Sequence, residues 1–186
     1  RPLDAGPYTF VAADALVLKV REGGRVVNVH ALIAVGVNAE GYREILGIDV
    51  TTAEDGAGWL TFWRSLTARG LSGVALVTSD AHAGLVEAIA ANLPGASWQR
   101  CRTHYAANLM SICPKNMWPA VKAMLHSVYD QPDAPAVHAQ FDRLIEYVTA
   151  KLPAVAQHLA NAREDILAFT AFPKDVWTQL WSNNPA

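Results

Sequence analysis

The sequence predicts an α/β protein in which a mixed five-stranded sheet carries an all-helical insertion. Three apolar, β-favouring segments come first, with only short turns between them. The apolar period then becomes helical, and a short strand, a second helix and a fifth strand follow. After Cys101 only helical periods remain. The chain has 186 residues, of which 52% are hydrophobic, enough for one domain with a sizeable insertion.

The first three predicted strands cover residues 8–20, 26–37 and 42–50. Glycine-containing turns at 21–25 and 38–41 join them, and connections this short make neighbouring strands antiparallel. The first strand is so apolar that we expect it to be covered on both faces of the sheet. Asp14 interrupts this apolar run.

Aromatic and leucine side chains then recur at helical spacing over residues 59–66, and Gly70 follows as a C-terminal cap. A strand over residues 74–79 comes next, and it must run parallel to an earlier strand because a helix carries the return. We predict a second helix over 85–93 and a fifth strand over 97–101. From residue 105 onward, helical stripes separated by prolines predict the insertion.

Charge and composition exclude several classes. No run approaches the roughly 18 apolar residues of a membrane span, and the N-terminus lacks the regions of a signal peptide. Two cysteines fit a reducing compartment, so we expect a cytoplasmic protein without membrane contact. The net charge of -2 gives no global sign of nucleic-acid binding. The chain starts at Arg1 without methionine, and we expect it to be an excised fragment.

Two aspartates are the leading candidates for a functional site. Asp14 lies within an apolar strand, where a carboxylate must be paired, protonated or metal-bound. Asp80 follows a buried strand, and open α/β sheets place their chemistry at such strand ends. If these strands are neighbours, the two carboxylates meet and would suit Mg²⁺ or Mn²⁺. Alternatively, Asp14 is a core carboxylate bonded to backbone, and Asp80 caps the next helix.

Short strings along the chain resemble the Mutator-type bacterial insertion-sequence transposases, which belong to the DDE class and have a ribonuclease H-like fold. The strings follow the order of that family over nearly the whole chain. They include Asp14-Ala15-Leu16, Gly36-Val37-Asn38, Glu40-Gly41-Tyr42-Arg43, Arg69-Gly70-Leu71, Ser79-Asp80-Ala81-His82-Ala83-Gly84-Leu85, Trp98-Gln99-Arg100-Cys101-Arg102-Thr103-His104 and Phe172-Pro173.

The resemblance implies an enzyme that cuts and joins transposon ends, acting on terminal inverted repeats and target DNA as a homodimer or larger assembly near the nucleoid. Two aspartates and one glutamate of the family hold two Mg²⁺ (or Mn²⁺) ions, and by motif Asp14 and Asp80 are these aspartates. The glutamate belongs shortly after an Asn-Pro near Asn184-Pro185, and the sequence ends before it, at Ala186. We therefore expect this fragment to bind metal weakly at most and not to cleave DNA.

The resemblance also implies three regions: a ribonuclease H-like core over 1–104, a helical insertion over 105–178, and the start of a truncated helix or loop over 179–186. Cys101 and His104 match a family signature near the active site, and we expect them to support the site or contact DNA. Taken alone, each residue is explained as well by a structural role, Cys101 as a core cysteine and His104 as a hydrogen-bonded histidine.

Other candidates carry less weight. His82, Arg100 and Arg102 are possible DNA contacts, as are Lys115 and Lys122, although scattered basic residues are usually solvated surface. Two alternatives remain open. One is a non-catalytic ribonuclease H-like module for DNA binding or assembly. The other is a zinc-stabilised domain built on Cys101, His104 and Cys113, with His82 as a fourth ligand, because structural zinc needs four ligands.

Overall fold

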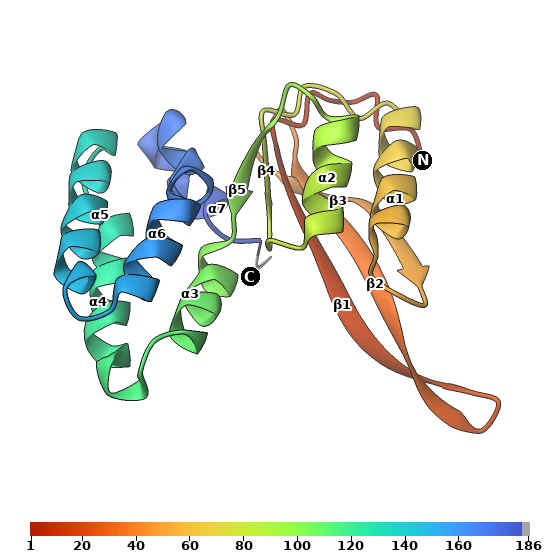
Figure 1. Cartoon of the computed structure of the whole chain (residues 1–186). Coiled ribbons are helices and arrows are strands. Elements are labelled where there is room, and N and C mark those ends of the chain that lie inside the picture. The colour runs from red at the N-terminus through yellow and green to blue at the C-terminus, as the bar shows by residue number, and fades with distance from the viewer. Residues whose placement is uncertain (184–186) are drawn as a thin grey trace. The chain divides into compact units, whose positions relative to one another are not determined.

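The computed structural model describes residues 1–183, and residues 184–186 lie outside the described part. The chain divides into two compact units (Figure 1). The sheet unit comprises Arg1–Trp98 together with Asn183, and the helical unit comprises Gln99–Ser182. The boundaries expected at 104 and 178 remain a prediction, and the last expected segment, 179–186, lies partly outside the described residues.

Five strands hydrogen-bond in the order β3-β2-β1-β4-β5. β1 and β2 are antiparallel, as are β2 and β3, whereas β4 runs parallel to β1. This arrangement confirms the predicted ribonuclease H-like sheet, a three-stranded meander extended by strands that return through helices. The elements are β1 (Phe10–Glu22), β2 (Arg25–Val37), β3 (Arg43–Thr51), α1 (Gly56–Ala68), β4 (Leu76–Ser79), α2 (Ala83–Asn92) and β5 (Ser97–Arg100).

β1 and β2 pair along their whole length and continue past their other neighbours. Their hairpin closes at Gly23 and Gly24, whose φ values of 56° and 78° suit glycine. Pairing with β3 stops at His30, and pairing with β4 stops at Ala12. Residues 18–29 therefore form a two-stranded ribbon that extends beyond the rest of the sheet, as Figure 1 shows.

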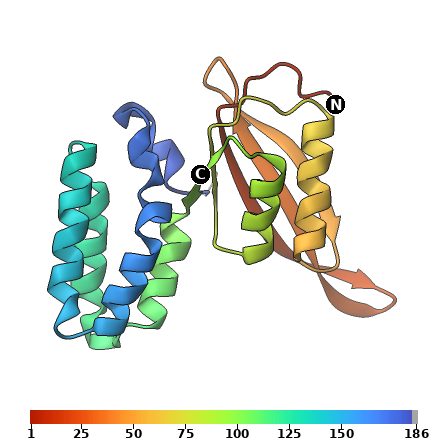
Figure 2. The ribbon, with the colours of Figure 1, turned by 45° about the horizontal axis from the view of Figure 1, so that its top comes forward.

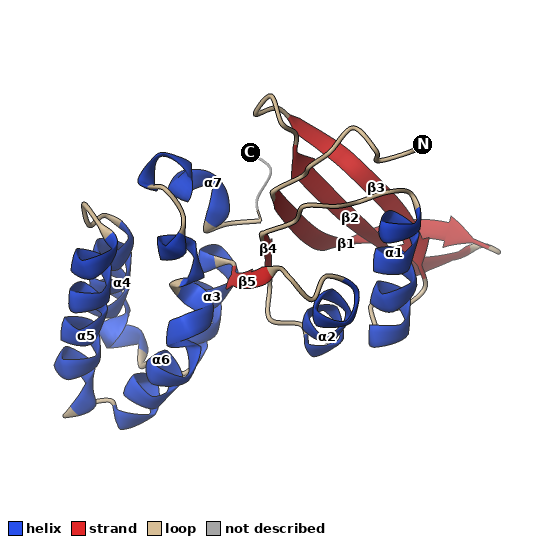
Figure 3. Ribbon diagram, turned by 90° about the horizontal axis from the view of Figure 1, so that it is seen from above, coloured by secondary structure: helices blue, strands red, loops and turns tan. Residues whose placement is uncertain are grey.

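Helices α1 and α2 cover one face of the sheet (Figure 3). Their buried side chains pack on Val11, Ala13 and Leu32 of the strands. The opposite face is exposed over β1 and β3, where Leu16 and Ile48 are 45% and 59% accessible. The expectation of a first strand covered on both faces is thus wrong for residues 1–183, because the packed helices of the sheet unit lie on one side only.

The N-terminal turns of α1 and α2 approach each other at two glycines. A Cβ atom on Gly84 would lie 2.6 Å from the Gly56 Cα and 2.7 Å from its nitrogen, both backbone atoms. Real side chains do not approach backbone this closely, so the pair of helices requires glycine at position 84. Gly84 follows Asp80 by four residues, and this contact fixes where α2 starts after β4.

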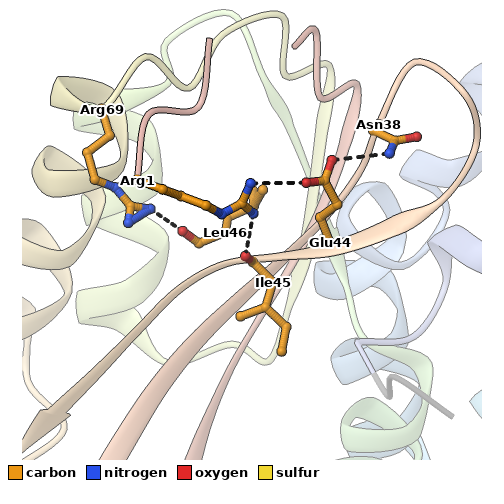
Figure 4. A network of polar contacts seen from close by, with 6 residues as sticks. All are labelled: Arg1, Asn38, Glu44, Ile45, Leu46 and Arg69. Carbon is orange, nitrogen blue, oxygen red and sulfur yellow. Dashed lines mark hydrogen bonds and ion pairs between the residues drawn. The ribbon is translucent and has the colours of Figure 1, made fainter. Parts of the chain in front are cut away.

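A polar network ties the N-terminus and the end of α1 to β3 (Figure 4). Arg1 donates hydrogen bonds to Glu44 Oε1 at 3.2 Å and to the Ile45 carbonyl at 2.9 Å. Asn38 Nδ2 donates to Glu44 Oε2 at 3.1 Å, and this bond, followed by the Arg1 contacts, holds the pKa of Glu44 below its ordinary value. Arg69, just past α1, donates to the Leu46 carbonyl.

The helical unit contains four longer helices that run side by side (Figure 2). No helix within residues 1–183 has the length and apolarity that crossing a membrane requires. The elements are α3 (Arg102–Ser111), α4 (Trp118–Tyr129), α5 (Ala134–Thr149), α6 (Pro153–Ile166) and α7 (Trp177–Leu180), with 3₁₀ turns at Lys115–Met117, Ala168–Ala171 and Lys174–Val176.

Gln99 joins the start of the helical unit to the end of α6 and the 3₁₀ turn that follows it. Its side chain is fully buried, and Nε2 donates to the carbonyls of Arg100 and Ile166 at 2.9 Å. Its Oε1 accepts from the Phe169 N–H at 2.7 Å. A single amide thus satisfies three backbone groups that would otherwise be buried without partners.

Candidate functional site

Asp14 lies on β1 next to the packed core. Its neighbour Ala13 is fully buried against the α1 and α2 layer. Because side chains alternate along a strand, Asp14 shares the opposite face with Ala12 and is half-buried there. Its Oδ1 accepts a hydrogen bond from the Ala15 N–H at 2.9 Å. The strand therefore fixes where this carboxylate lies, and a local bond helps to orient it.

Asp80 follows β4 directly and is held by a short chain of hydrogen bonds. Trp98 Nε1 donates to Ser79 Oγ at 2.8 Å, and Ser79 Oγ donates to the Asp80 carbonyl at 2.8 Å. The Asp80 carboxylate accepts from the His82 N–H at 3.3 Å. The N-cap of α2 is His82, whose Nδ1 accepts from the Leu85 N–H at 3.3 Å. The alternative in which Asp80 caps the helix is therefore wrong.

The parallel register brings the two aspartates to the same level of the sheet. β1 and β4 pair from Phe10 and Leu76 to Ala12 and Thr78. Asp14 and Asp80 each lie two residues beyond the last of these pairs. Ala13 and Val77 point into the core, so alternation puts Asp14 and Thr78 on the other side. Both acids thus lie at the same level of the sheet, Asp14 within β1 and Asp80 directly after the end of β4.

The donor chemistry of this pair fits Mg²⁺ or Mn²⁺. Both candidates are carboxylates, and Mg²⁺ in proteins is commonly bound through one or two carboxylates while waters and phosphate oxygens fill the other positions. Within residues 1–183 no group of three or more His, Cys, Asp or Glu side chains is arranged to hold a metal ion. Asp14 and Asp80 supply two carboxylates, and by themselves they do not make up such a group.

A third residue next to Asp14 had no assigned role in the sequence prediction. Asn183 is buried, and its Nδ2 donates to the Ala13 carbonyl at 3.1 Å. This bond brings the chain that leaves the helical unit back to β1, one residue before Asp14. An asparagine in a loop gives no sequence signal of such a contact, because its partner lies 170 residues away.

Cys101 and His104 lie at the start of α3 in the helical unit. Cys101 is the buried N-cap residue, and its Sγ lies 3.7 Å from Ser182 Oγ. His104 is half-buried in the first helical turn. Cys113 is also buried, and its Sγ lies 3.7 Å from the Pro114 carbonyl. Neither cysteine forms a disulfide, and the alternative of a zinc cluster gains no support from the described residues.

The two flanking arginines also belong to the helical unit and rest on aromatic rings. Arg100 lies over Tyr105, 4.9 Å from the ring centroid, and donates to Asn108 Oδ1 at 3.1 Å. Arg102 lies over Trp181. The structure thus places Asp14 and Asp80 at the same level of adjacent strands in the sheet unit, where His82 also lies. Arg100, Cys101, Arg102 and His104 lie at or just before the start of α3 in the helical unit.

The fold and the aspartate pair define a class: a ribonuclease H-like core with one carboxylate within β1 and another directly after the adjacent parallel strand β4. The family model described as transposase, Mutator family, matches residues 1–186. The chain belongs to the Mutator family of transposases.

Curated relatives are transposases of bacterial insertion sequences. The transposase for insertion sequence element IS1081 of Mycobacterium tuberculosis is 76% identical over 185 residues, covering 100% of this chain and 45% of that protein. The transposase for IS256 in transposon Tn4001 of Staphylococcus aureus is 34% identical over 172 residues, covering 91% of this chain and 44% of that protein. The chain thus spans a little under half the length of these relatives.

Among solved structures, the HTLV-2 integrase catalytic core domain in complex with magnesium aligns with 75% of this chain and 86% of that chain. The TM-score is 0.37 at 10% sequence identity, and a likeness of this size carries no conclusion about function.

Proposed function

We propose that this chain is the catalytic-core region of a DNA transposase, and that Asp14 and Asp80 hold divalent ions used to cut and join DNA at transposon ends. The observation that carries the proposal is the parallel register, in which both acids lie two residues beyond the paired Ala12 and Thr78. Membership of the Mutator family supports it independently.

The chain's own groups position the carboxylates. The Ala15 N–H holds one oxygen of Asp14, and the His82 N–H holds one oxygen of Asp80. These local bonds restrict both side chains before any ligand arrives, which lowers the entropy lost on binding. Bound there, two Mg²⁺ or Mn²⁺ ions would activate a water or a 3′-hydroxyl and stabilise the leaving oxygen.

The resemblance implies a third ligand, a glutamate beyond Ala186 in a longer protein. Asn183 supports this placement, because its bond to Ala13 leads the chain to β1 beside Asp14. We propose that two carboxylates without a third ligand bind metal weakly and do not suffice to cleave DNA. We propose that the whole protein acts on terminal inverted repeats and target DNA as a homodimer or larger assembly, in the cytoplasm at the nucleoid.

Titration with Mn²⁺ or Mg²⁺, followed by calorimetry, tests the aspartate pair. Asp14→Asn or Asp80→Asn should weaken metal binding by about ten-fold or more, since even supporting residues of metal sites are worth that much. Asp49→Asn is the matched control, because Asp49 is exposed on β3 and its carboxylate accepts from the next N–H at 2.9 Å, as Asp14 does. Metal binding that survives both substitutions together would show that Asp14 and Asp80 are not the ligands.

A non-catalytic module is the second candidate, favoured by the lack of a third ligand among residues 1–183. A protein that extends past Pro185 separates the two. The catalytic proposal expects an acidic residue within about two helical turns and nicking of transposon-end DNA. An extension that contains no such acidic residue and does not nick DNA would favour the non-catalytic module over the transposase.

A further inference from the structure

A groove of about 350 Å³ lies between α3 and α4 in the helical unit. Its apolar part is formed by Met110 of α3 and Leu125 of α4, both buried. Three basic side chains line it as well: Arg102 from the first turn of α3, and Lys122 and His126 from α4. Lys122 and His126 are exposed. The groove therefore joins an apolar part to cationic groups from two helices.

The groove lies in a part of the chain that has no acidic residues. Between Glu87 and Asp130 the sequence contains no aspartate or glutamate, although the whole chain carries a net charge of -2. Both helices of the groove fall within this stretch. Positive charge at the groove is thus not neutralised by neighbours in sequence, and the formal charge of this stretch is positive whereas that of the whole chain is negative.

Arg102 is held in place by aromatic rings. Its guanidinium carbon lies 4.6 Å from the Trp181 ring centroid and 5.3 Å from the Tyr129 ring centroid. Arg1 and Arg163 pair with carboxylates, whereas Arg102 forms no ion pair with any residue in 1–183. A stacked guanidinium loses less side-chain entropy when it binds, and its planar donors match phosphate oxygens.

We propose that the α3–α4 groove binds the phosphodiester backbone of DNA. Arg102 and Lys122 contact backbone phosphates from opposite sides of the groove. The inference rests on the proposed function, since it names a surface by which a transposase core would hold its DNA. It requires no metal ion at Asp14 and Asp80.

The test measures binding of a fluorescein-labelled 20-base-pair duplex by anisotropy over a range of salt concentrations. Lys122→Gln should weaken binding about 3- to 10-fold at low salt and reduce the salt slope by about one, as the loss of one phosphate contact predicts. Lys151→Gln removes the same charge from another exposed lysine of the helical unit and should change affinity less than two-fold. Arg102→Lys keeps the charge, loses the stacking, and should give a smaller loss than Arg102→Gln.

Three results would contradict the proposal that the α3–α4 groove binds DNA. They are unchanged binding in Lys122→Gln, equal weakening by Lys122→Gln and Lys151→Gln, and Lys122-dependent binding of a poly-glutamate peptide without binding of the duplex. The metal proposal fails separately. If Mn²⁺ binding survives Asp14→Asn with Asp80→Asn while DNA binding still depends on Lys122 in the presence of EDTA, the groove stands and the catalytic pair does not.

Discussion

His158 on α6 illustrates how burial sets the charge of one side chain. Its Nδ1 lies 3.1 Å from the Tyr105 hydroxyl, and the two rings are 5.4 Å apart between centroids. Burial, followed by the positive charge of Arg100, lowers the pKa of His158. Burial also raises the pKa of Tyr105. Both partners are therefore neutral near pH 7, and the folded helical unit favours the uncharged imidazole.

The lowered pKa of His158 predicts a pH dependence of stability. The unfolded chain, with an ordinary histidine pKa of about 6.5, takes up the proton first as pH falls. The contribution of the neutral imidazole is thus complete above that value and is lost progressively as pH falls towards the lower folded pKa. His158→Gln should reduce the drop in melting temperature between pH 7.5 and 5, measured by scanning calorimetry.

His126→Gln is the control for this prediction, because His126 is exposed in the same unit. It should keep the pH dependence of the unsubstituted chain. A His158→Gln chain whose melting temperature falls as steeply as that of the unsubstituted chain would show that His158 does not titrate in this way.

At the residue scale, the sequence singled out the aspartates as candidates for a physical reason. A carboxylate in an apolar strand needs a partner, and this makes Asp14 visible without a structure. The sequence did not predict His82 as the N-cap of α2, because histidine is an uncommon N-cap residue whereas aspartate, present at Asp80, is a preferred one. Asn183 was not visible either, since its buried bond depends on tertiary contact.

At the element scale, turn residues and apolar period predicted the strands of the sheet closely. The expected strands at 26–37 and 42–50 are Arg25–Val37 and Arg43–Thr51 in the structure, and the predicted parallel strand is Leu76–Ser79. Glycine pairs and helical spacing depend only on residues close together in the chain, so they can be read from a single sequence. Which face of a strand is covered depends on the helices packed there, and for this reason the exposure of Leu16 and Ile48 was missed.

The approach of α1 to α2 predicts the effect of adding a single methyl group. Gly84→Ala would gain up to about 1 kcal/mol in helix propensity. The new Cβ, however, would lie 2.6 Å from the Gly56 Cα, and overpacking against backbone costs about 1–3 kcal/mol. The cost of the clash exceeds the gain in helix propensity, and urea unfolding should show a lower free energy of unfolding for Gly84→Ala.

Gly95→Ala is the matched control for Gly84→Ala, because no atom lies within 4 Å of its added Cβ. It should leave stability unchanged or slightly raised. Equal stability of the Gly84→Ala chain and the unsubstituted chain would mean that the two helices separate without cost.

At the scale of the whole molecule, the division into two units predicts separate local stabilities. Gln99→Ala removes three bonds within the helical unit and leaves buried backbone groups unpaired, at a cost of about 2 kcal/mol or more. In hydrogen exchange followed by mass spectrometry, peptides from α3 to α6 should exchange faster, while those from β1 and β2 should not change.

Gln157→Ala serves as the control for this measurement, since Gln157 is an exposed glutamine on α6. It should leave both sets of peptides unchanged. Faster exchange in β1 and β2 as well as in the helices of a Gln99→Ala chain would show that the units unfold as one.

The bond between Asn183 and Ala13 also affects the order of assembly during synthesis. Its two residues are 170 positions apart, so the ribosome must produce the entire helical unit before the sheet unit can form this contact. Closing so long a loop is entropically costly while the intervening chain is unfolded. A helical unit that has already collapsed shortens the effective loop, and we therefore expect the Asn183 contact to form after the helices.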